Sequence, residues 1–254
     1  MGVAVVTGSA SGIGAAVRRR LEQDGDRVIG VDLRDTEVVA DLATPAGRAD
    51  ALNRILQACD GRLDRLVLCA GLGSHVEDLA AIVSVNYFGA VELLDGLRDA
   101  LRGGEQPAAV AICSNAAQIA TFDDHPLVVA LLAEDENQAR AVAAGRNGFV
   151  AYAASKHALS RALRRRATAW GEAGVRLNGI APGVTETPLL RGTEQHPVWG
   201  KGLAGLAIPL GRRAQPDEMA AIVAFLLGAD TSYVHGSIWY ADGGTDAAIR
   251  PDRF

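Results

Sequence analysis

The chain has 254 residues, of which 49% are hydrophobic and 22% charged, and its formal net charge is −5. This length and composition suffice for one large α/β domain with a sizeable core. Composition argues against a nucleic-acid partner, because that partner requires a basic surface. The chain has no stretch of 18 apolar residues and no leader-like segment, so we expect a cytoplasmic protein with no membrane partner.

Apolar runs typical of strands alternate with helical patterns along the chain. The strands are predicted at residues 3–7, 27–31, 38–40, 65–69, 108–113, 175–180 and 237–240, and the helices at 12–23, 46–58, 83–101, 149–170 and 216–226. This alternation predicts a parallel sheet of about seven strands with helices on both faces. We therefore expect a single-domain, Rossmann-type, doubly wound α/β fold over residues 1–254, with a ligand crevice at the carboxyl ends of the strands.

The first predicted strand leads directly into the turn Thr7-Gly8-Ser9-Ala10-Ser11-Gly12-Ile13-Gly14 and then into a helix. Its three glycines permit a tight turn and a close approach of the backbone to a pyrophosphate at the helix N-terminus. Taken alone, the motif also fits an ordinary packed loop. Asp32, which follows the second strand, favours the first interpretation, because a carboxylate there accepts hydrogen bonds from the adenosine ribose. It also repels a 2′-phosphate, which favours NAD over NADP. Arg34 could pair with that phosphate, or it could lie in solvent or stack on adenine.

Three cysteines, Cys59, Cys69 and Cys113, lie far apart in apolar surroundings. This pattern is typical of buried free thiols in a reducing compartment and not of disulfides. The five histidines and three cysteines lack metal-ligand spacing, so we expect no metal.

A tyrosine and a lysine stand four residues apart in the predicted helix 149–170. Only two of the 25 basic residues are lysines, and one of them, Lys156, follows Tyr152 at this spacing. Residues four apart share a helix face, which places the ammonium beside the phenol. A lysine supplies a compact charge with three donors, for which the planar fork of arginine is no substitute. A charge at about 4 Å is expected to lower the pKa of the phenol from about 10 toward 7.

With these motifs the chain resembles the short-chain dehydrogenase/reductases over essentially its whole length. Further matches are Val85-Asn86, Ser114, Ala241-Asp242-Gly243-Gly244 and Cys69-Ala70-Gly71, which stands where the family usually has Asn-Ala-Gly. The resemblance implies an NAD(P)-dependent oxidoreductase that acts on CH–OH groups. It implies cofactor contacts at Gly8, Ser11, Gly12, Ile13, Gly14, Asp32, Asp41, Leu42, Cys69, Ala70, Gly71, Tyr152, Lys156, Pro182, Gly183, Thr185 and Thr187.

The resemblance also implies that four residues are catalytic. Tyr152 acts as the general acid and base, and Lys156 holds the nicotinamide ribose. Ser114 hydrogen-bonds the substrate oxygen, and Asn86 holds a water that links Lys156 to solvent as a proton relay. Each residue alone also has an ordinary interpretation, because Ser114 could cap a turn, Asn86 could satisfy backbone groups within its helix and Tyr152 could be an interface aromatic.

Two segments are expected to govern substrate choice. Residues 184–213 combine apolar side chains with Gly and Pro, which predicts a mobile lid over a hydrophobic substrate, with an ordinary packed loop as the alternative. The apolar side chains of this lid are Val184, Leu189, Leu190, Trp199, Leu203, Leu206 and Ile208.

The second segment, residues 116–148, belongs to an unusually long stretch between Ser114 and Tyr152. It contains a helix-forming run at 126–144 with Glu134, Asp135 and Glu136 on an expected solvated face. This insertion could wall the substrate cleft, and it should obstruct the helix packing by which many family members form tetramers. We therefore expect a homo-oligomer that is a dimer.

Longer strings resemble, more narrowly, the bacterial 3-alpha-hydroxysteroid dehydrogenase/carbonyl reductases; they lie at residues 31–35, 67–73, 84–90, 169–178 and 182–190. This implies NAD-dependent interconversion of a 3-alpha-hydroxysteroid and its 3-ketosteroid, with reduction of other bulky carbonyls also possible. One alternative is another hydrophobic alcohol dehydrogenase or ketoreductase, including a 3-oxoacyl reductase, although Asp32 conflicts with the usual NADPH preference of the latter. The other is a nicotinamide-binding sensor without turnover, which does not need Ser114, Tyr152 and Lys156 together.

Overall fold

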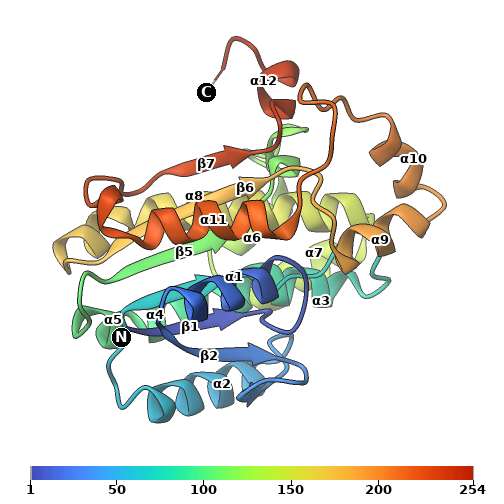
Figure 1. The fold of residues 1–254 in the computed structure, drawn as a ribbon. Coiled ribbons are helices and arrows are strands. Elements are labelled where there is room, and N and C mark those ends of the chain that lie inside the picture. Colours follow the sequence, from blue (N-terminus) through green and yellow to red (C-terminus); the bar gives the residue numbers. More distant parts are fainter. Residues whose placement is uncertain (1, 254) are drawn as a thin grey trace.

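The computed structural model describes residues 2–253, in which seven parallel strands form one sheet in the order β3-β2-β1-β4-β5-β6-β7 (Figure 1). The strands are β1 (Val3–Thr7), β2 (Arg27–Asp32), β3 (Val38–Val39), β4 (Arg65–Leu68), β5 (Ala108–Ile112), β6 (Arg176–Pro182) and β7 (Ile238–Ala241). The predicted fold class is confirmed. The strand order reverses between β1 and β4, and in such sheets the ligand crevice lies at this switch point.

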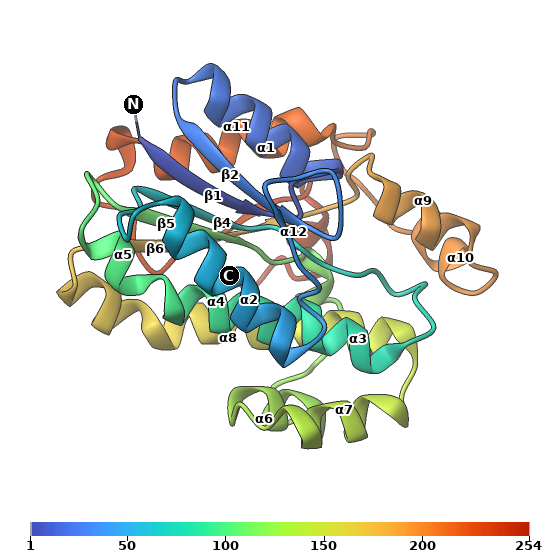
Figure 2. The same ribbon diagram turned by 90° about the horizontal axis from the view of Figure 1, so that it is seen from below.

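Helices cover both faces of the sheet (Figure 2). On one face lie α1 (Gly12–Gln23) and α11 (Pro216–Leu227), and on the other lie α2 (Pro45–Ala58), α4 (Gly89–Gly96), α5 (Arg98–Arg102) and α8 (Gly148–Glu172). In β1, Ala4 and Val6 pack with α1 and α11, whereas Val5 packs into the core of the opposite face. Successive side chains of a strand point to opposite faces, so a strand covered on both sides is apolar throughout.

The predicted helix 83–101 is wrong in its continuity. The chain forms α3 (Leu79–Val83), a π-helical turn η1 (Ser84–Phe88), then α4, and α5 begins after a break at Leu97. In a π-turn the backbone hydrogen bond spans five residues, one more than in an α-helix, and such turns are often found at functional sites. The stretch Leu79–Gly96 is long and apolar enough by composition to cross a membrane, but 67% of it is buried inside the fold. It therefore packs as a core helix.

The insertion forms two helices where a single run was predicted. Helix α6 (Pro126–Leu132) ends before Glu134, whose φ of 58° reverses the chain, and α7 (Glu136–Ala144) follows. Asp135 caps α7 by accepting a hydrogen bond of 2.9 Å from the backbone N–H of Gln138. The pair forms an additional layer, with α6 against α8 and α7 against α3 (Figure 2).

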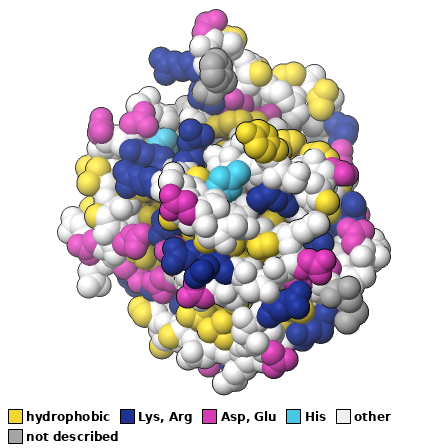
Figure 3. Space-filling model, turned by 90° about the vertical axis from the view of Figure 1, so that its left-hand side faces the viewer, with side chains coloured by type: hydrophobic (Ala, Val, Ile, Leu, Met, Phe, Trp, Pro, Cys, Tyr) yellow, Lys and Arg dark blue, Asp and Glu magenta, His cyan; other side chains and the backbone are white. Residues whose placement is uncertain are grey.

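The segment 184–213 carries α9 (Pro188–Gln195) and α10 (Trp199–Ala204), which lie beyond the carboxyl ends of the strands (Figure 1). The remaining elements are the 3₁₀ turns η2 (Asn115–Gln118) and η3 (Ala229–Thr231) and the helix α12 (Thr245–Ile249). At the opposite end of the sheet, basic and acidic side chains are interspersed over the surface (Figure 3).

Candidate active site

A cavity of about 840 Å³ opens at the carboxyl ends of the strands, beside the β1–β4 switch point. Every residue predicted to contact the cofactor lines it, together with Ser114. Asn86 is outside its lining and is fully buried. The structure therefore brings three of the four predicted catalytic residues to one cavity and places the fourth behind its wall.

The glycine-rich turn forms one end of this cavity. Gly8 has a φ of 68°, and a Cβ there would lie 2.9 Å from the backbone of Ala70. A Cβ on Gly14 would lie 2.1 Å from the carbonyl oxygen of Gly8, so neither position accepts a side chain. The N-terminus of α1 faces the cavity at Gly12 and Ile13, where helix N–H groups attract an anion.

Asp32 stands beside this turn at the end of β2. Its Oδ2 accepts a hydrogen bond of 2.9 Å from the N–H of Ala10, and its Oδ1 accepts one of 2.7 Å from the N–H of Leu33. Each carboxylate oxygen keeps a further lone pair for a ligand hydroxyl. The side chain of Arg34 is 85% exposed and lies 3.8 Å from Asp35, which fits the solvated interpretation of this arginine.

Cys69 follows β4 where the family usually has asparagine. The hydroxyl of Thr7 accepts hydrogen bonds of 3.0 Å from the backbone N–H groups of both Cys69 and Ala70. Thr7 thus ties β1 to the chain that leaves β4. Burial raises the pKa of the Cys69 thiol to about 12 although the residue lines the cavity.

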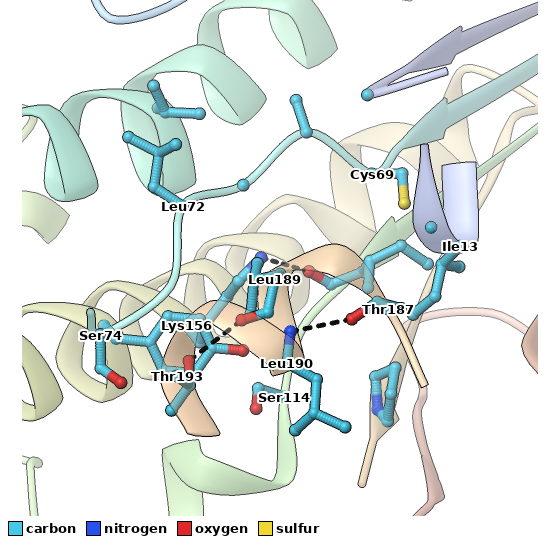
Figure 4. A pocket seen from close by; sticks show the side chains of 18 of the residues that line it. Ile13, Cys69, Leu72, Ser74, Ser114, Lys156, Thr187, Leu189, Leu190 and Thr193 are labelled. Carbon is cyan, nitrogen blue, oxygen red and sulfur yellow. Dashed lines mark hydrogen bonds between the residues drawn. The ribbon is translucent and has the colours of Figure 1, made fainter. Parts of the chain in front are cut away.

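Ser114 follows β5, and Tyr152 lies in the first turns of α8 (Figure 4 shows Ser114). Burial raises the pKa of the Tyr152 phenol, and the nearby hydroxyl of Ser114 opposes this effect. The hydroxyl of Ser114 also accepts a hydrogen bond of 3.2 Å from the N–H of Ala116. Ser114 therefore caps the turn η2, as its ordinary interpretation suggested, while its hydroxyl also meets Tyr152.

Lys156 is 4% exposed, and its Nζ donates a hydrogen bond of 2.7 Å to the carbonyl oxygen of Ile112. Burial lowers the pKa of this ammonium, and the neighbouring thiols Cys113 and Cys69 oppose the effect. The expectation that Lys156 brings the pKa of Tyr152 toward 7 is wrong for this structure, because burial of the phenol outweighs the other effects and raises its pKa.

Asn86 uses its side chain to hold the loop that follows β4. Its Oδ1 accepts a hydrogen bond of 2.8 Å from the N–H of Leu72, and its Nδ2 donates to the carbonyl oxygen of Leu72 at 3.0 Å. This resembles the ordinary interpretation, except that the backbone belongs to the loop and not to its own helix. A Cβ on Gly71 would lie 3.2 Å from Asn86 Oδ1 and 3.5 Å from Lys156 Nζ, so both side chains converge on this glycine.

The other end of the cavity is apolar and is covered by α9 and α10 (Figure 4 shows Leu189, Leu190 and Thr193). Six of the seven predicted lid side chains line it, and Ile208 instead lines a smaller cavity beside β7. Sequence reasoning missed Ser74, Phe149 and Thr193. Of these, only Phe149 could have been predicted from the sequence, because it lies three residues before Tyr152 and therefore on the same helix face. Its ring lies 6.1 Å from that of Trp199.

The insertion contributes little to this cavity. Of residues 116–148, Ala116 and Ile119 line it, whereas α6 and α7 do not. The suggestion that the inserted helices wall the substrate cleft is therefore wrong, because they pack outward on α3 and α8. Within residues 2–253, no three His, Cys, Asp or Glu side chains are grouped to hold a metal ion.

Two family models match the chain, one described as short chain dehydrogenase over residues 2–123 and one as enoyl-(acyl carrier protein) reductase over residues 137–246. The chain is 52% identical, over the full length of both proteins, to a 3-alpha-hydroxysteroid dehydrogenase/carbonyl reductase from Comamonas testosteroni. The chain belongs to the short-chain dehydrogenase/reductase family.

This short-chain dehydrogenase/reductase is also similar to a solved structure, the 3-alpha-hydroxysteroid dehydrogenase from Pseudomonas sp. B-0831 complexed with NADH. The TM-score is 0.98 at 45% identity, with 99% of this chain and 100% of the other covered. A 3-oxoacyl-acyl-carrier-protein reductase from Thermotoga maritima is 29% identical over 95% of this chain and 96% of its own length. The short-chain dehydrogenase/reductase fold therefore extends over the whole chain.

Proposed function

We propose that the protein is an NAD-dependent dehydrogenase that interconverts a 3-alpha-hydroxysteroid and the corresponding 3-ketosteroid. The observation that carries this proposal is one continuous cavity. It joins the glycine-rich turn and Asp32 at one end, Ser114, Tyr152 and Lys156 in the middle, and an apolar lid at the other end. The chain's 52% identity to the Comamonas testosteroni enzyme supports the steroid substrate.

The residues at the first end fit NAD. The glycines at 8, 12 and 14 bring bare backbone to the N-terminus of α1, where the pyrophosphate would bind, and Asp32 would accept hydrogen bonds from the ribose. Asp41 and Leu42 would contact the adenine, and Pro182, Gly183, Thr185 and Thr187 would contact the nicotinamide half. When bound, NAD supplies the acceptor for hydride and NADH its donor.

Tyr152 would move the proton. Because burial raises the pKa of its phenol, the group is protonated at neutral pH and suits the donation of a proton to a ketone oxygen. In the oxidation direction the phenol must first lose this proton, so the rate should rise with pH. Ser114 would hydrogen-bond the same substrate oxygen, and Lys156 would hold the ribose from within the cavity wall. The proposed role of Asn86 is to connect Lys156 to solvent through a water.

The apolar end suits a rigid hydrocarbon skeleton. Phe149 and Trp199 face one another there, and Leu189, Leu190 and Leu203 complete the lining. Such a surface binds by removing apolar area from water and offers few groups for a polar substrate.

We also propose a homodimer in the cytoplasm. Helices α6 and α7 cover α8 and α3, which supports an assembly that does not use this side of the molecule. Cys59, Cys69 and Cys113 are free thiols, which is typical of a reducing compartment.

The test is an absorbance assay of NADH formation with NAD or NADP and a panel of alcohols. The panel holds a 3-alpha-hydroxysteroid, its 3-beta epimer, an aromatic secondary alcohol and a 3-hydroxyacyl thioester. We expect turnover of the 3-alpha-hydroxysteroid with NAD. Turnover of the thioester alone would instead favour a 3-oxoacyl reductase, and tight NADH binding without any turnover would favour a sensor.

A further inference from the structure

A buried arginine joins the insertion to the rest of the fold. Arg48, on α2, is 2% exposed. Its Nη2 and Nη1 donate to the two carboxylate oxygens of Glu136 at 2.5 and 3.2 Å, and its Nε donates to Glu92 at 2.7 Å. The expectation that Glu136 lies on a solvated face is wrong, because its side chain is only 17% exposed. A buried guanidinium requires such partners, since an unpaired charge in the interior is strongly destabilising.

Glu136 has a second partner at the start of the π-helical turn. Its Oε1 accepts a hydrogen bond of 2.6 Å from the hydroxyl of Ser84, and Arg140 Nη1 donates to the same hydroxyl at 2.8 Å. Ser84 is fully buried and is the first residue of η1. Two side chains of α7 thus hold the turn where it begins, and the bond to a carboxylate is of the stronger, charge-assisted kind.

The turn held in this way carries Asn86. A π-turn is rare, and Asn86 lies in it two residues after Ser84, so the contacts of Ser84 bear directly on where Asn86 lies. Asn86 fixes Leu72 at the cavity wall, and its Nδ2 donates to Ser155 Oγ at 3.2 Å. Ser155 Oγ in turn donates to the carbonyl oxygen of Tyr152 at 2.7 Å. A connected series of contacts therefore leads from α7 to the backbone of the proposed acid and base.

We infer that Glu136 is a positioning residue for the reaction. Acting through Ser84, it fixes the π-helical turn, and through Asn86 the turn sets both the loop at Leu72 and the helix position of Tyr152. The inserted helices thereby contribute to the site without lining the cavity. This inference rests on the proposed function, since it concerns the same reaction.

The sharpest variant is Ser84→Ala. It removes the link to η1 but leaves Arg48 bound to Glu136 and to the carbonyl oxygen of Leu42, which is 3.2 Å from Nη1, so the proposed adenine pocket is preserved. Glu136→Ala removes the contacts of Glu136 with Ser84 and with Arg48, whereas Glu136→Gln keeps an oxygen that can accept the hydrogen bond from Ser84. The matched control is Glu134→Gln in the same insertion. Glu134 contacts Arg166, and in the variant Arg166 keeps its other hydrogen bond, of 2.6 Å, to Asp95.

Two measurements are made on the purified, full-length variants. In hydrogen–deuterium exchange, we expect faster exchange at residues 72 and 84–90 in Ser84→Ala and Glu136→Ala, and wild-type exchange in Glu134→Gln. In steady-state kinetics, we expect kcat to fall about tenfold in Ser84→Ala and Glu136→Ala, with KM for NAD within about twofold of wild type in Ser84→Ala. The pH dependence of kcat should also move, and Glu136→Gln should recover most of the activity.

Wild-type exchange at residues 72 and 84–90 in Ser84→Ala and Glu136→Ala overturns the inference, whatever the protein's substrate. So does wild-type kcat with an unchanged pH profile, or an equal loss of activity in Glu134→Gln. Failure of the proposed function looks different, because the wild-type protein itself would then not turn over the 3-alpha-hydroxysteroid. Thermal unfolding of each variant shows that the compared samples are folded.

Discussion

The Nδ1 atom of His75 lies 3.2 Å from the hydroxyl of Thr193, which joins the loop after β4 to helix α9 of the lid. The Thr193 hydroxyl donates to the carbonyl oxygen of Leu189 at 3.1 Å, so it is free to accept from the imidazole. Gly192 makes room for the ring, since a Cβ there would lie 2.4 Å from His75 Nε2. His75 thus connects the lid helix α9 to the loop that follows β4.

Removal of this contact is expected to loosen the lid. In His75→Ala we expect KM for the steroid to rise roughly five- to tenfold, because closure over the substrate is less favourable, while NADH affinity stays within about twofold. Burial lowers the pKa of His75, so the ring is neutral at pH 7. Glu77→Gln, exposed in the same loop, is the control. An unchanged KM in His75→Ala would show that the lid closes without this contact.

Tyr152→Phe is expected to lower kcat by about 100- to 10,000-fold, the usual contribution of a general acid or base. NADH binding, followed by fluorescence titration, should stay within about twofold, because the ring and its packing are retained. Tyr240→Phe changes a tyrosine outside the large cavity and should keep full activity. If Tyr152→Phe keeps the wild-type kcat, Tyr152 is not the general acid and base.

Asp32→Ala is expected to relax cofactor selectivity. Loss of the carboxylate removes both an acceptor for the ribose and the repulsion of a 2′-phosphate, so the ratio of kcat/KM for NAD to that for NADP should fall at least about tenfold. The neighbouring variant Asp35→Asn loses the charge of an exposed contact with Arg34 and keeps a residue type that tolerates the φ of 56° at this position, so it should keep the wild-type ratio. If the ratio of kcat/KM values is unchanged in Asp32→Ala, residues other than Asp32 determine the preference for NAD over NADP.

The three thiols are expected to resist alkylation. Burial disfavours the thiolate, so the pKa of Cys69 rises to about 12 and the pKa values of Cys59 and Cys113 also rise. At pH 8 Cys69 should therefore react with iodoacetamide roughly a thousandfold more slowly than an ordinary thiol, and its rate should still increase tenfold per pH unit up to pH 10. The urea-unfolded protein provides the reference rate for all three residues. Rapid labelling of folded protein at Cys69 would contradict the burial argument.

The solution mass of the protein should be that of a dimer. Analytical ultracentrifugation distinguishes this from a tetramer, in which α8 would have to pack against another subunit on a side that α6 and α7 now cover. A mass of four chains would show that the insertion does not prevent that assembly.

The parallel sheet and the cavity could be predicted because their signals are local. The glycine-rich turn fixes the end of β1 and the start of α1, and both elements begin and end where the sequence placed them. Most of the predicted cofactor residues lie at the end of a strand or the start of a helix, and in a parallel sheet such positions meet at one edge. Tyr152 and Lys156 lie within α8 and were found by their spacing on one helix face.

What could not be predicted depends on contacts between distant residues. Nothing in the sequence of Ser84–Phe88 signals a π-turn, and the hydrogen bond of Ser84 with Glu136 on α7 joins residues 52 positions apart. Glu136 looked solvated because its partner Arg48 lies 88 positions earlier in the chain. Asn86 was expected to hold a water that links Lys156 to solvent, and nothing in the sequence indicated that its amide also hydrogen-bonds the loop at Leu72, 14 positions earlier in the chain.

The scarcity of lysine has a practical consequence. Lys156 is buried and hydrogen-bonded, and burial lowers its pKa, whereas Lys201 is exposed on α10. Among lysine side chains, an amine-reactive dye should therefore attach to Lys201 alone. The protein carries a natural attachment point for a fluorophore on its lid, so opening and closing could be watched in single molecules without introducing a cysteine.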